Sequence, residues 1–158
     1  MGRAFLAGRA SGRGRSAVSG AGYSGTPLPR KLGIKEGHRV LLAGAPHGFR
    51  NALAPLPSGV RIHGRASRDD YDVVLLFALR GSTLGRRLPA LARRLAWAGG
   101  LWICWPKKAS GVPTDLSGGA VRAAGLDAGL VDNKVCAVDE TWSGLRFVYR
   151  VEDRPAAS

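Results

Sequence analysis

The segment Asp72-Val73-Val74-Leu75-Leu76-Phe77-Ala78 constrains the fold of this chain more than any other part of the sequence. Its apolar residues follow one another without alternation, which indicates a strand that is covered on both faces. Strands of this kind lie inside parallel sheets that are sandwiched between helices. Residues 39–43 form a second apolar run and predict another buried strand of the same sheet.

Strands and helices alternate in the rest of the chain. Leucines at helical spacing predict a helix over residues 84–98 that ends at Gly99-Gly100, and a weaker helix is expected after Thr114-Asp115. Shorter segments complete the pattern, with helices over 28–32 and 49–54 and strands over 60–63, 101–105, 135–138 and 145–149. The last two strands flank a hairpin turn at residues 141–144. This order predicts an α/β three-layer Rossmann-like sandwich, in which a mostly parallel sheet is closed by an antiparallel C-terminal hairpin.

The length of 158 residues fits a single domain, which we place at residues 23–152. Of residues 1–22, 18 are Gly, Ala, Arg or Ser. Such a composition buries too little apolar surface to offset the entropy of ordering, and it predicts a disordered tail. A second short disordered tail is expected over residues 153–158.

The chain is strongly basic, with 24 Lys and Arg residues against 11 Asp and Glu and a formal net charge of +13. This balance favours anionic partners, among them small anionic molecules and nucleic acid. An Arg-rich, Ala- and Gly-rich composition also arises from GC-rich coding, so the charge alone identifies no partner. Few aromatic residues interleave with the basic ones, which argues against stacking on nucleic-acid bases.

Cysteine and histidine usage gives little support to metal or redox chemistry. Cys104 and Cys136 lie in apolar, strand-like runs, and we expect them to be buried free thiols in a reducing cytoplasm. The three histidines, His38, His47 and His63, are too widely spread to support a metal site. No apolar stretch approaches the roughly 18 residues of a membrane span, so no membrane partner is expected. The sequence indicates no particular cofactor.

Several blocks of the sequence are informative together. They are Tyr23-Ser24-Gly25-Thr26-Pro27-Leu28, Lys31-Leu32-Gly33-Ile34, Trp105-Pro106-Lys107-Lys108, Ser110-Gly111, Thr114-Asp115-Leu116, Val135-Cys136-Ala137-Val138-Asp139 and Thr141-Trp142-Ser143-Gly144-Leu145-Arg146. In combination they resemble the bacterial domain-of-unknown-function family 3052, over about Tyr23 to Arg150. The resemblance implies a fold unit and a bacterial cytoplasmic setting, and it supplies no activity.

The order of strands, glycine loop and closing hairpin also resembles, more loosely, the Rossmann-like methyltransferases. The loop after the first strand, Gly44-Ala45-Pro46-His47-Gly48, departs from the glycine spacing that lets backbone amides approach a nucleotide. The second strand ends in His63-Gly64, where an acidic residue would hold the ribose hydroxyls, although Asp69 or Asp70 could substitute. The resemblance therefore implies a degenerate methyltransferase-like enzyme.

Ligands of open parallel sheets bind beyond the carboxyl ends of the strands, where three loops are expected to meet. The candidate ligand-binding residues on these loops are His47, Gly48, Arg80, Ser82, Lys107, Lys108, Ser110 and Gly111. Basic side chains, hydroxyl groups and open glycine amides of this kind suit an anion. A solvated loop is the alternative for the lysine pair. No nucleophile and base stand out as a pair, so the catalytic residues stay unassigned.

Tryptophans mark two further places. Trp102 and Trp105 are three apart, so on a strand they face opposite sides of the sheet. Trp142, Ser143 and Arg146 form a candidate partner surface on the hairpin, although Trp142 could instead cap the core. The neighbouring carboxylates Asp139 and Glu140 are expected to bond turn amides and Arg146.

The sequence as a whole favours a cytoplasmic domain that binds an anionic ligand or a protein partner, without clear catalysis. A nucleic-acid-associated basic protein and a degenerate methyltransferase-like enzyme are the alternatives.

Overall fold

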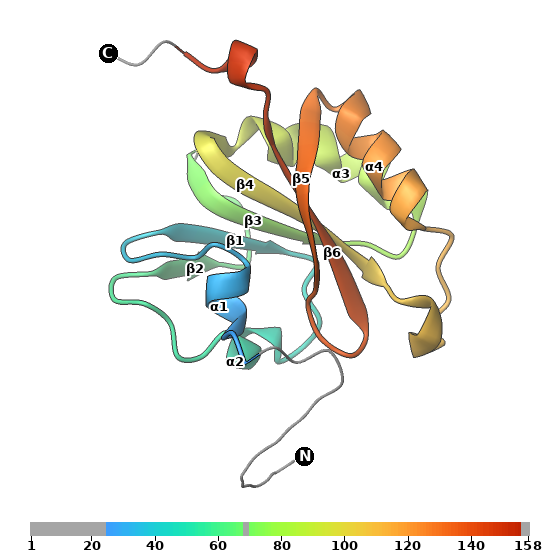
Figure 1. Cartoon of the computed structure of the whole chain (residues 1–158), viewed down its shortest axis with the longest axis horizontal. Helices are drawn as coiled ribbons and strands as arrows, with labels where there is room; N and C mark the ends of the chain where they lie inside the picture. The colour runs from blue at the N-terminus through green and yellow to red at the C-terminus, as the bar shows by residue number, and fades with distance from the viewer. Residues whose placement is uncertain (1–24, 68–69, 156–158) are drawn as a thin grey trace, which may run out of the picture.

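A computed structural model describes residues 25–67 and 70–155, and the tail expected over residues 1–22 lies outside them. One six-stranded sheet forms the centre, in the order β2-β1-β3-β4-β6-β5 (Figure 1). Four strands run parallel, namely β1 (Arg39–Ala43), β2 (Arg61–His63), β3 (Tyr71–Phe77) and β4 (Leu95–Pro106). The strands β5 (Leu130–Ala137) and β6 (Trp142–Tyr149) form a hairpin whose second strand runs antiparallel to β4. The predicted α/β sandwich with a closing hairpin is confirmed.

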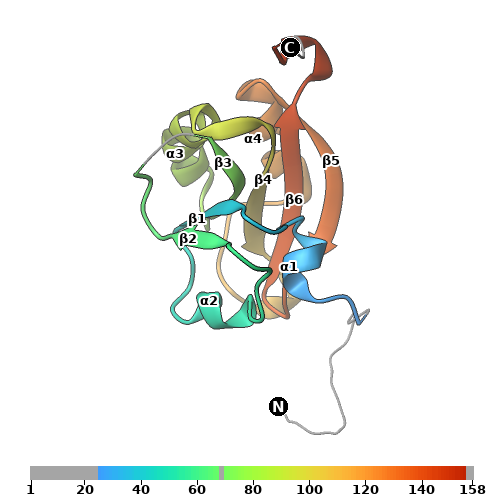
Figure 2. The ribbon, with the colours of Figure 1, turned by 90° about the vertical axis from the view of Figure 1, so that its left-hand side faces the viewer.

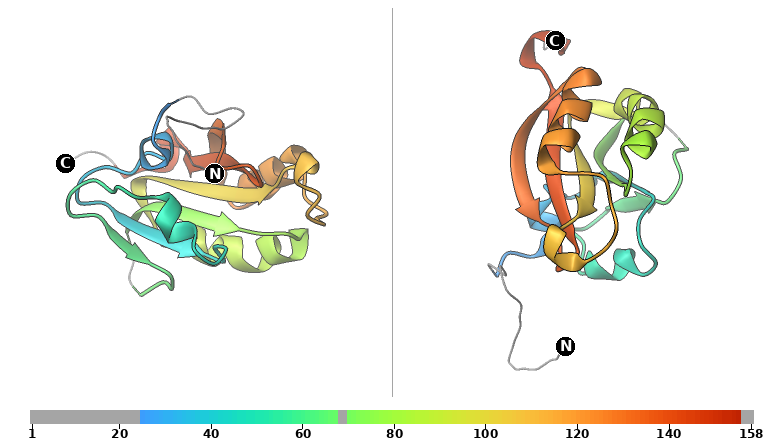
Figure 3. Two further views of the ribbon diagram at one scale, coloured as in Figure 1. Left: turned by 90° about the horizontal axis from the view of Figure 1, so that it is seen from below. Right: turned by 90° about the vertical axis from the view of Figure 1, so that its right-hand side faces the viewer.

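Helices cover both faces of the sheet. On one face lie α1 (Leu28–Lys31) and α2 (Phe49–Ala52), and on the other α3 (Gly81–Arg93) and α4 (Gly118–Asp127). Figure 2 shows α1 and α3 on opposite sides of the sheet, and Figure 3 shows α4 alongside the hairpin. The side chains of β3 divide between two cores, since Val73 packs on the α1 side and Val74 on the α3 side. This division explains why the strand is apolar without alternation.

Trp102 joins α1 to the sheet. Its side chain is fully buried in the core on the α1 side, and its indole Nε1 donates a hydrogen bond of 3.0 Å to the backbone oxygen of Leu32. Trp105 is buried in the core on the opposite face, so the two tryptophans face opposite sides as predicted. Leu32 directly follows α1, and the hydrogen bond therefore fixes the end of that helix over the sheet.

The boundary between α3 and β4 differs from the prediction. The helix already ends at Arg93, and β4 begins at Leu95, so Gly99-Gly100 lies inside the strand and does not end a helix. A Cβ at Gly99 would stand 2.7 Å from the backbone oxygen of Asp72. A glycine can mark the end of an element, but within a strand it can also mark a place where another backbone approaches closely. The close approach of Asp72 explains the glycine at position 99.

The C-terminal hairpin is longer than predicted. The strand β6 starts at Trp142, which moves the turn to residues 138–141, and Asp139 Oδ1 accepts hydrogen bonds from the backbone N–H groups of Thr141 and Trp142, both at 2.8 Å. The expected contact of this carboxylate with Arg146 is not made, because the guanidinium points to Asn133 instead.

The described part of the chain continues beyond β6 to residue 155. A 3-10 turn covers Val151–Asp153, and the guanidinium of Arg154 donates two hydrogen bonds to the backbone oxygen of Tyr149, at 3.2 and 3.0 Å. Residues 153–155, which the sequence assigned to the second tail, belong to the described part of the chain, and residues 156–158 lie outside it.

The two cysteines flank Gly144 across the sheet. Cys104 of β4 and Cys136 of β5 both pair with this glycine, and both are free thiols, as expected. Cys104 is buried and Cys136 is half-buried. Burial raises the pKa of the Cys104 thiol well above its ordinary value, and it also raises the pKa of Cys136, although nearby Lys31 acts in the opposite direction there.

Candidate functional site

The loop after β1 lines one end of the predicted site. A shallow pocket of about 320 Å³ lies at the ends of β1 and β2, and its lining residues are Leu42, Gly44, Ala45, Pro46, Gly48, Phe49, Arg50 and Gly64. Gly44 has a φ of +71°, and a Cβ there would stand 2.9 Å from the backbone oxygen of Phe77, so only glycine fits. Of the predicted site residues, Gly48 lines this pocket, whereas His47, Lys107 and Lys108 do not.

The loops after β3 and β4 bind each other. Ser110 Oγ donates to the backbone oxygen of Lys107 at 2.6 Å and accepts from the N–H of Val112 at 3.2 Å. The backbone N–H of Gly81, at the start of α3, donates to Asp115 Oδ1 at 2.8 Å. The hydroxyl of Ser110 and the amide of Gly81 therefore already have hydrogen-bond partners within the protein at this edge of the sheet. Arg80, Ser82 and Lys108 are exposed, while Gly111 is exposed at a turn with a φ of +74°.

The helix expected after Thr114-Asp115 starts later in the structure. Thr114 Oγ1 donates to the backbone oxygen of Leu79 at 2.6 Å, so this residue links the two loops. The helix α4 begins at Gly118, with Ser117 as its N-cap, whose Oγ accepts from the N–H of Ala120 at 3.2 Å. The N-terminus of α4 therefore lies farther along the chain from the predicted ligand-binding loops than the sequence suggested.

The predicted partner surface on the hairpin divides between two roles. Trp142 is half-buried and packs edge-on against the ring of Phe77, with centroids 5.1 Å apart, so it caps the core on the α1 side. Ser143 is half-buried beside it. Arg146 faces a pocket of its own.

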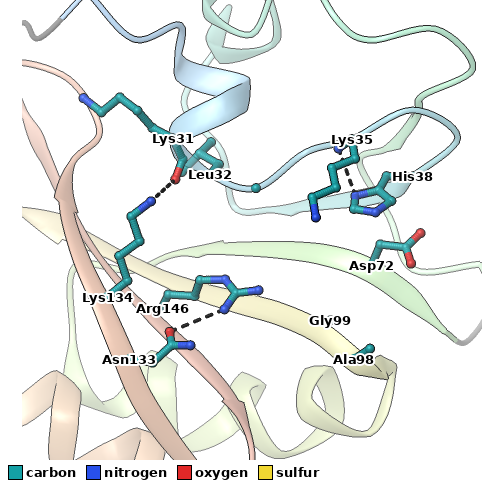
Figure 4. A pocket seen from close by; sticks show the side chains of 11 residues that line it. Lys31, Leu32, Lys35, His38, Asp72, Ala98, Gly99, Asn133, Lys134 and Arg146 are labelled. Atoms are coloured by element: carbon teal, nitrogen blue, oxygen red, sulfur yellow. Dashed lines mark hydrogen bonds between the residues drawn. The ribbon is translucent and has the colours of Figure 1, made fainter.

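A basic pocket of about 490 Å³ lies on the α1 face, away from the carboxyl ends of β1 and β3. Its lining residues come from α1, from the segment before β1 and from four strands: Lys31, Leu32, Gly33, Lys35, His38, Asp72, Ala98, Gly99, Asn133, Lys134 and Arg146. Figure 4 shows Lys134 and Arg146 on one side of this pocket and Lys35, His38 and Asp72 on the other. We call this set the basic pocket.

Arg146 holds a central place in the basic pocket because of a glycine beneath it. A Cβ at Gly100 would stand only 2.3 Å from the guanidinium Nε, so the bare backbone leaves the room in which the guanidinium lies. Its Nη1 donates a long hydrogen bond of 3.4 Å to Asn133 Oδ1. Burial lowers the pKa of Arg146, with a smaller contribution from the charge of Arg154. The guanidinium is therefore partly desolvated, and a desolvated cation gains more from an anionic partner than an exposed one.

Backbone contacts hold the lysines at the same side. Lys134 stands beside Arg146 in the hairpin register, and its Nζ donates to the backbone oxygen of Lys31 at 3.2 Å. Lys31 Nζ donates to the backbone oxygen of Ala137 at 3.0 Å. These contacts tie α1 to the hairpin and leave donor capacity on each ammonium group, which carries three hydrogens.

The opposite side of the basic pocket is mixed in charge. His38 Nδ1 accepts from the backbone N–H of Lys35 at 3.1 Å, which leaves the proton of a neutral ring on Nε2. Asp72 Oδ2 accepts from the backbone N–H of Arg39 at 2.9 Å. In the part of the chain that the structure describes, the other oxygen of Asp72 accepts no hydrogen bond.

The net charge of the basic pocket is positive. Its four cations are Lys31, Lys35, Lys134 and Arg146, and Asp72 is its only carboxylate. Within residues 25–67 and 70–155, none of these cations forms an ion pair. Unpaired cations around a cavity produce a positive potential that attracts anions. The described residues contain no group of His, Cys, Asp and Glu that could hold a metal ion, and none of their helices has the length and hydrophobicity to cross a membrane.

Sequence reasoning did not single out most of the residues of the basic pocket. Of the basic pocket, only Arg146 was singled out, and as part of a partner surface. Lys31 and Lys134 are 103 positions apart, and only the docking of α1 beside the hairpin brings them together. A signal was present in the hairpin, since Lys134 and Arg146 stand opposite each other in its two paired strands.

Solved structures with a similar fold include methyltransferases. A SAM-dependent methyltransferase from Aquifex aeolicus matches with a TM-score of 0.56 at 17% identity, over 76% of this chain and 86% of that chain. The magnesium protoporphyrin IX methyltransferase of Synechocystis, with bound SAM, matches with a TM-score of 0.54 at 12% identity, over 78% and 74%. Aeropyrum pernix fibrillarin, also with bound SAM, matches with a TM-score of 0.51 at 14% identity, over 80% and 70%. The chain therefore has a methyltransferase-like fold.

No protein-family model and no curated protein matches this chain. The resemblance to the domain-of-unknown-function family 3052 therefore stays a prediction.

The residues at the ends of β1 and β2 do not fit S-adenosylmethionine in the way nucleotide-binding sheets hold such cofactors. The helix after the glycine loop, α2, is a single turn of four residues. No carboxylate ends β2, where His63 Nδ1 instead contacts the hydroxyl of Tyr71 at 2.6 Å. Asp70 directly precedes β3 and so lies at the opposite edge of the sheet, while Asp69 lies outside the described residues. The expected carboxylate for the ribose is thus not supplied by Asp70.

Proposed function

We propose that this protein is a binding domain with a methyltransferase-like fold, which holds a small anionic ligand in the basic pocket. The observation that carries the proposal is the convergence of four cations without an ion-pair partner around a cavity of about 490 Å³. That volume lies within the range of about 300–1,000 Å³ that small-molecule sites occupy. Cations with open donor positions bind phosphate, sulfate or carboxylate groups by charge-assisted hydrogen bonds.

Calorimetric titration of the full chain with inorganic phosphate and pyrophosphate at low salt tests the proposal. We expect binding that weakens by about tenfold in Lys134→Ala, since a charge-assisted hydrogen bond contributes about 1.5–3 kcal/mol. The matched control is Lys108→Ala, which removes the same charge from an exposed turn outside the basic pocket. Equal loss in both variants would mean that the net charge of +13, and no particular site, attracts these anions.

Methyl transfer is a second candidate, favoured by the fold. The fold is similar to that of structures that hold SAM, and the pocket at the ends of β1 and β2 is open. The missing carboxylate and the one-turn α2 oppose it. Titration with S-adenosylhomocysteine separates the two candidates. Tight binding that Gly48→Val abolishes and Lys134→Ala leaves intact would support methyl transfer and contradict the absence of a cofactor site.

A further inference from the structure

The two sides of the basic pocket differ in charge, and the difference defines the ligand more closely. Lys31, Lys134 and Arg146 stand at the hairpin side, where the pocket has no carboxylate. At the other side, Lys35 and His38 stand with Asp72. One end of the pocket is therefore strongly cationic, while the other end offers both donors and an acceptor.

The sheet sets the distance between these two ends. Arg146 stands on β6 and Asp72 on β3, with β4 between them, which makes two steps of about 4.8 Å, or about 10 Å between the two backbones. The floor between the two ends carries little side-chain bulk, since Gly99 and Ala98 line it. A ligand longer than a single phosphate group is needed to reach from Arg146 to Asp72.

We propose that the ligand is a phosphate ester with a polyhydroxylated body, such as a sugar phosphate. Its phosphate group is held by Lys134 and Arg146, and its hydroxyl groups donate to the open oxygen of Asp72 and accept from His38 Nε2 and Lys35. This proposal rests on the proposed anion binding in the basic pocket. It accounts for Asp72, a carboxylate that a site for a bare anion would exclude, because like charges repel.

The variant Asp72→Asn tests the proposal, because it should change the affinity for hydroxylated and for plain phosphate ligands in opposite directions. The amide oxygen can keep the hydrogen bond from the N–H of Arg39, and the amide NH₂ then faces the pocket, so an acceptor is exchanged for a donor. For glucose 6-phosphate we expect Asp72→Asn to weaken binding by about tenfold. For inorganic phosphate and for hexyl phosphate, which lacks the hydroxyl groups, the same variant should strengthen binding, because a repelling charge is removed.

The wild-type protein should also bind glucose 6-phosphate about tenfold more tightly than hexyl phosphate. Titration of the full chain with these three probes separates the failure of this inference from the failure of the proposed function. If no probe binds, the anion site itself is contradicted. If the probes bind alike and Asp72→Asn strengthens binding of all three, the anion site stands and the polyhydroxylated body is ruled out. Thermal unfolding of Asp72→Asn serves as the check that the variant is folded.

Discussion

The guanidinium of Arg146 lies directly over the backbone of Gly100, at a place where any β-carbon would stand 2.3 Å from its Nε. The two residues belong to neighbouring antiparallel strands, β4 and β6. Removing one side chain entirely makes room for the longest cationic side chain of the pocket. Gly100 is thus required by the packing of Arg146, and it also determines where the guanidinium lies in the candidate site.

Gly100→Ala should displace Arg146 from the basic pocket. We expect a loss of about 1–3 kcal/mol in the free energy of unfolding from overpacking, together with weaker binding of inorganic phosphate. Urea unfolding and calorimetric titration measure the two effects. The control is Gly85→Ala, since a Cβ at that exposed helical glycine meets no atom within 4 Å. If Gly100→Ala unfolds and binds phosphate as the wild type does, the position of Arg146 does not depend on Gly100.

Trp102→Phe should loosen α1. The substitution removes the indole N–H that bonds the buried backbone oxygen of Leu32, and an unsatisfied buried acceptor costs about 1–3 kcal/mol. Because Lys31 precedes that residue, phosphate binding should weaken as well. Chemical unfolding and titration test both expectations against Trp97→Phe, which alters a side chain that is 47% exposed. Equal stability of the two variants would show that the Trp102 hydrogen bond does not anchor α1.

Two glycines of α4 should respond to alanine in opposite directions. A Cβ at Gly125 would stand 2.0 Å from the ring of Phe147, whereas a Cβ at Gly119 meets only the Oγ of Ser117 at 4.0 Å. Gly125→Ala should therefore lower the free energy of unfolding by about 1–3 kcal/mol or more, and Gly119→Ala should raise it by up to about 1 kcal/mol through helix propensity. Thermal unfolding of both variants decides. Stabilisation by Gly125→Ala would mean that α4 stands farther from β6 than described.

The architecture was largely predictable because it depends on local apolar patterns. The unbroken run of β3 required cover on both faces, and the spacing of Trp102 and Trp105 placed them on opposite faces of β4. The start of β4 was not predictable in the same way. Residues 95–98 continue the leucine spacing of α3, and a strand forms there through the pairing of Leu95 with Tyr71, a contact that local sequence does not encode.

The candidate site was much less predictable than the fold. The loops at the carboxyl ends of the strands carry suitable residue types, but Ser110 bonds within its own loop and the amide of Gly81 bonds the neighbouring loop. The basic pocket instead depends on how α1 packs on the hairpin, which brings Lys31 to Lys134. Such a contact between distant segments leaves no spacing pattern in the sequence.

Alkaline conditions should destabilise the protein through Cys104. Burial raises the pKa of this thiol well above its ordinary value of 9.0 in the folded protein, so between the two pKa values the folded state keeps a proton that the unfolded state loses. The stability from this group is fully present below about pH 9 and falls as the pH rises further. Tyr149 acts with the same sign above about pH 10, because burial raises its pKa from the ordinary value of 10.0.

Urea unfolding of wild type and Cys104→Ala between pH 7.5 and pH 10.5 measures this contribution. The variant should be less stable at pH 7.5, since it leaves a small cavity in the core, and its free energy of unfolding should fall less steeply above pH 9. Cys136→Ala is the control, because Cys136 is only half-buried and nearby lysines oppose the rise in its pKa. Parallel pH profiles for the wild type and Cys104→Ala would show that the buried thiol does not set the alkaline limit, and Tyr149→Phe would then be examined in the same series.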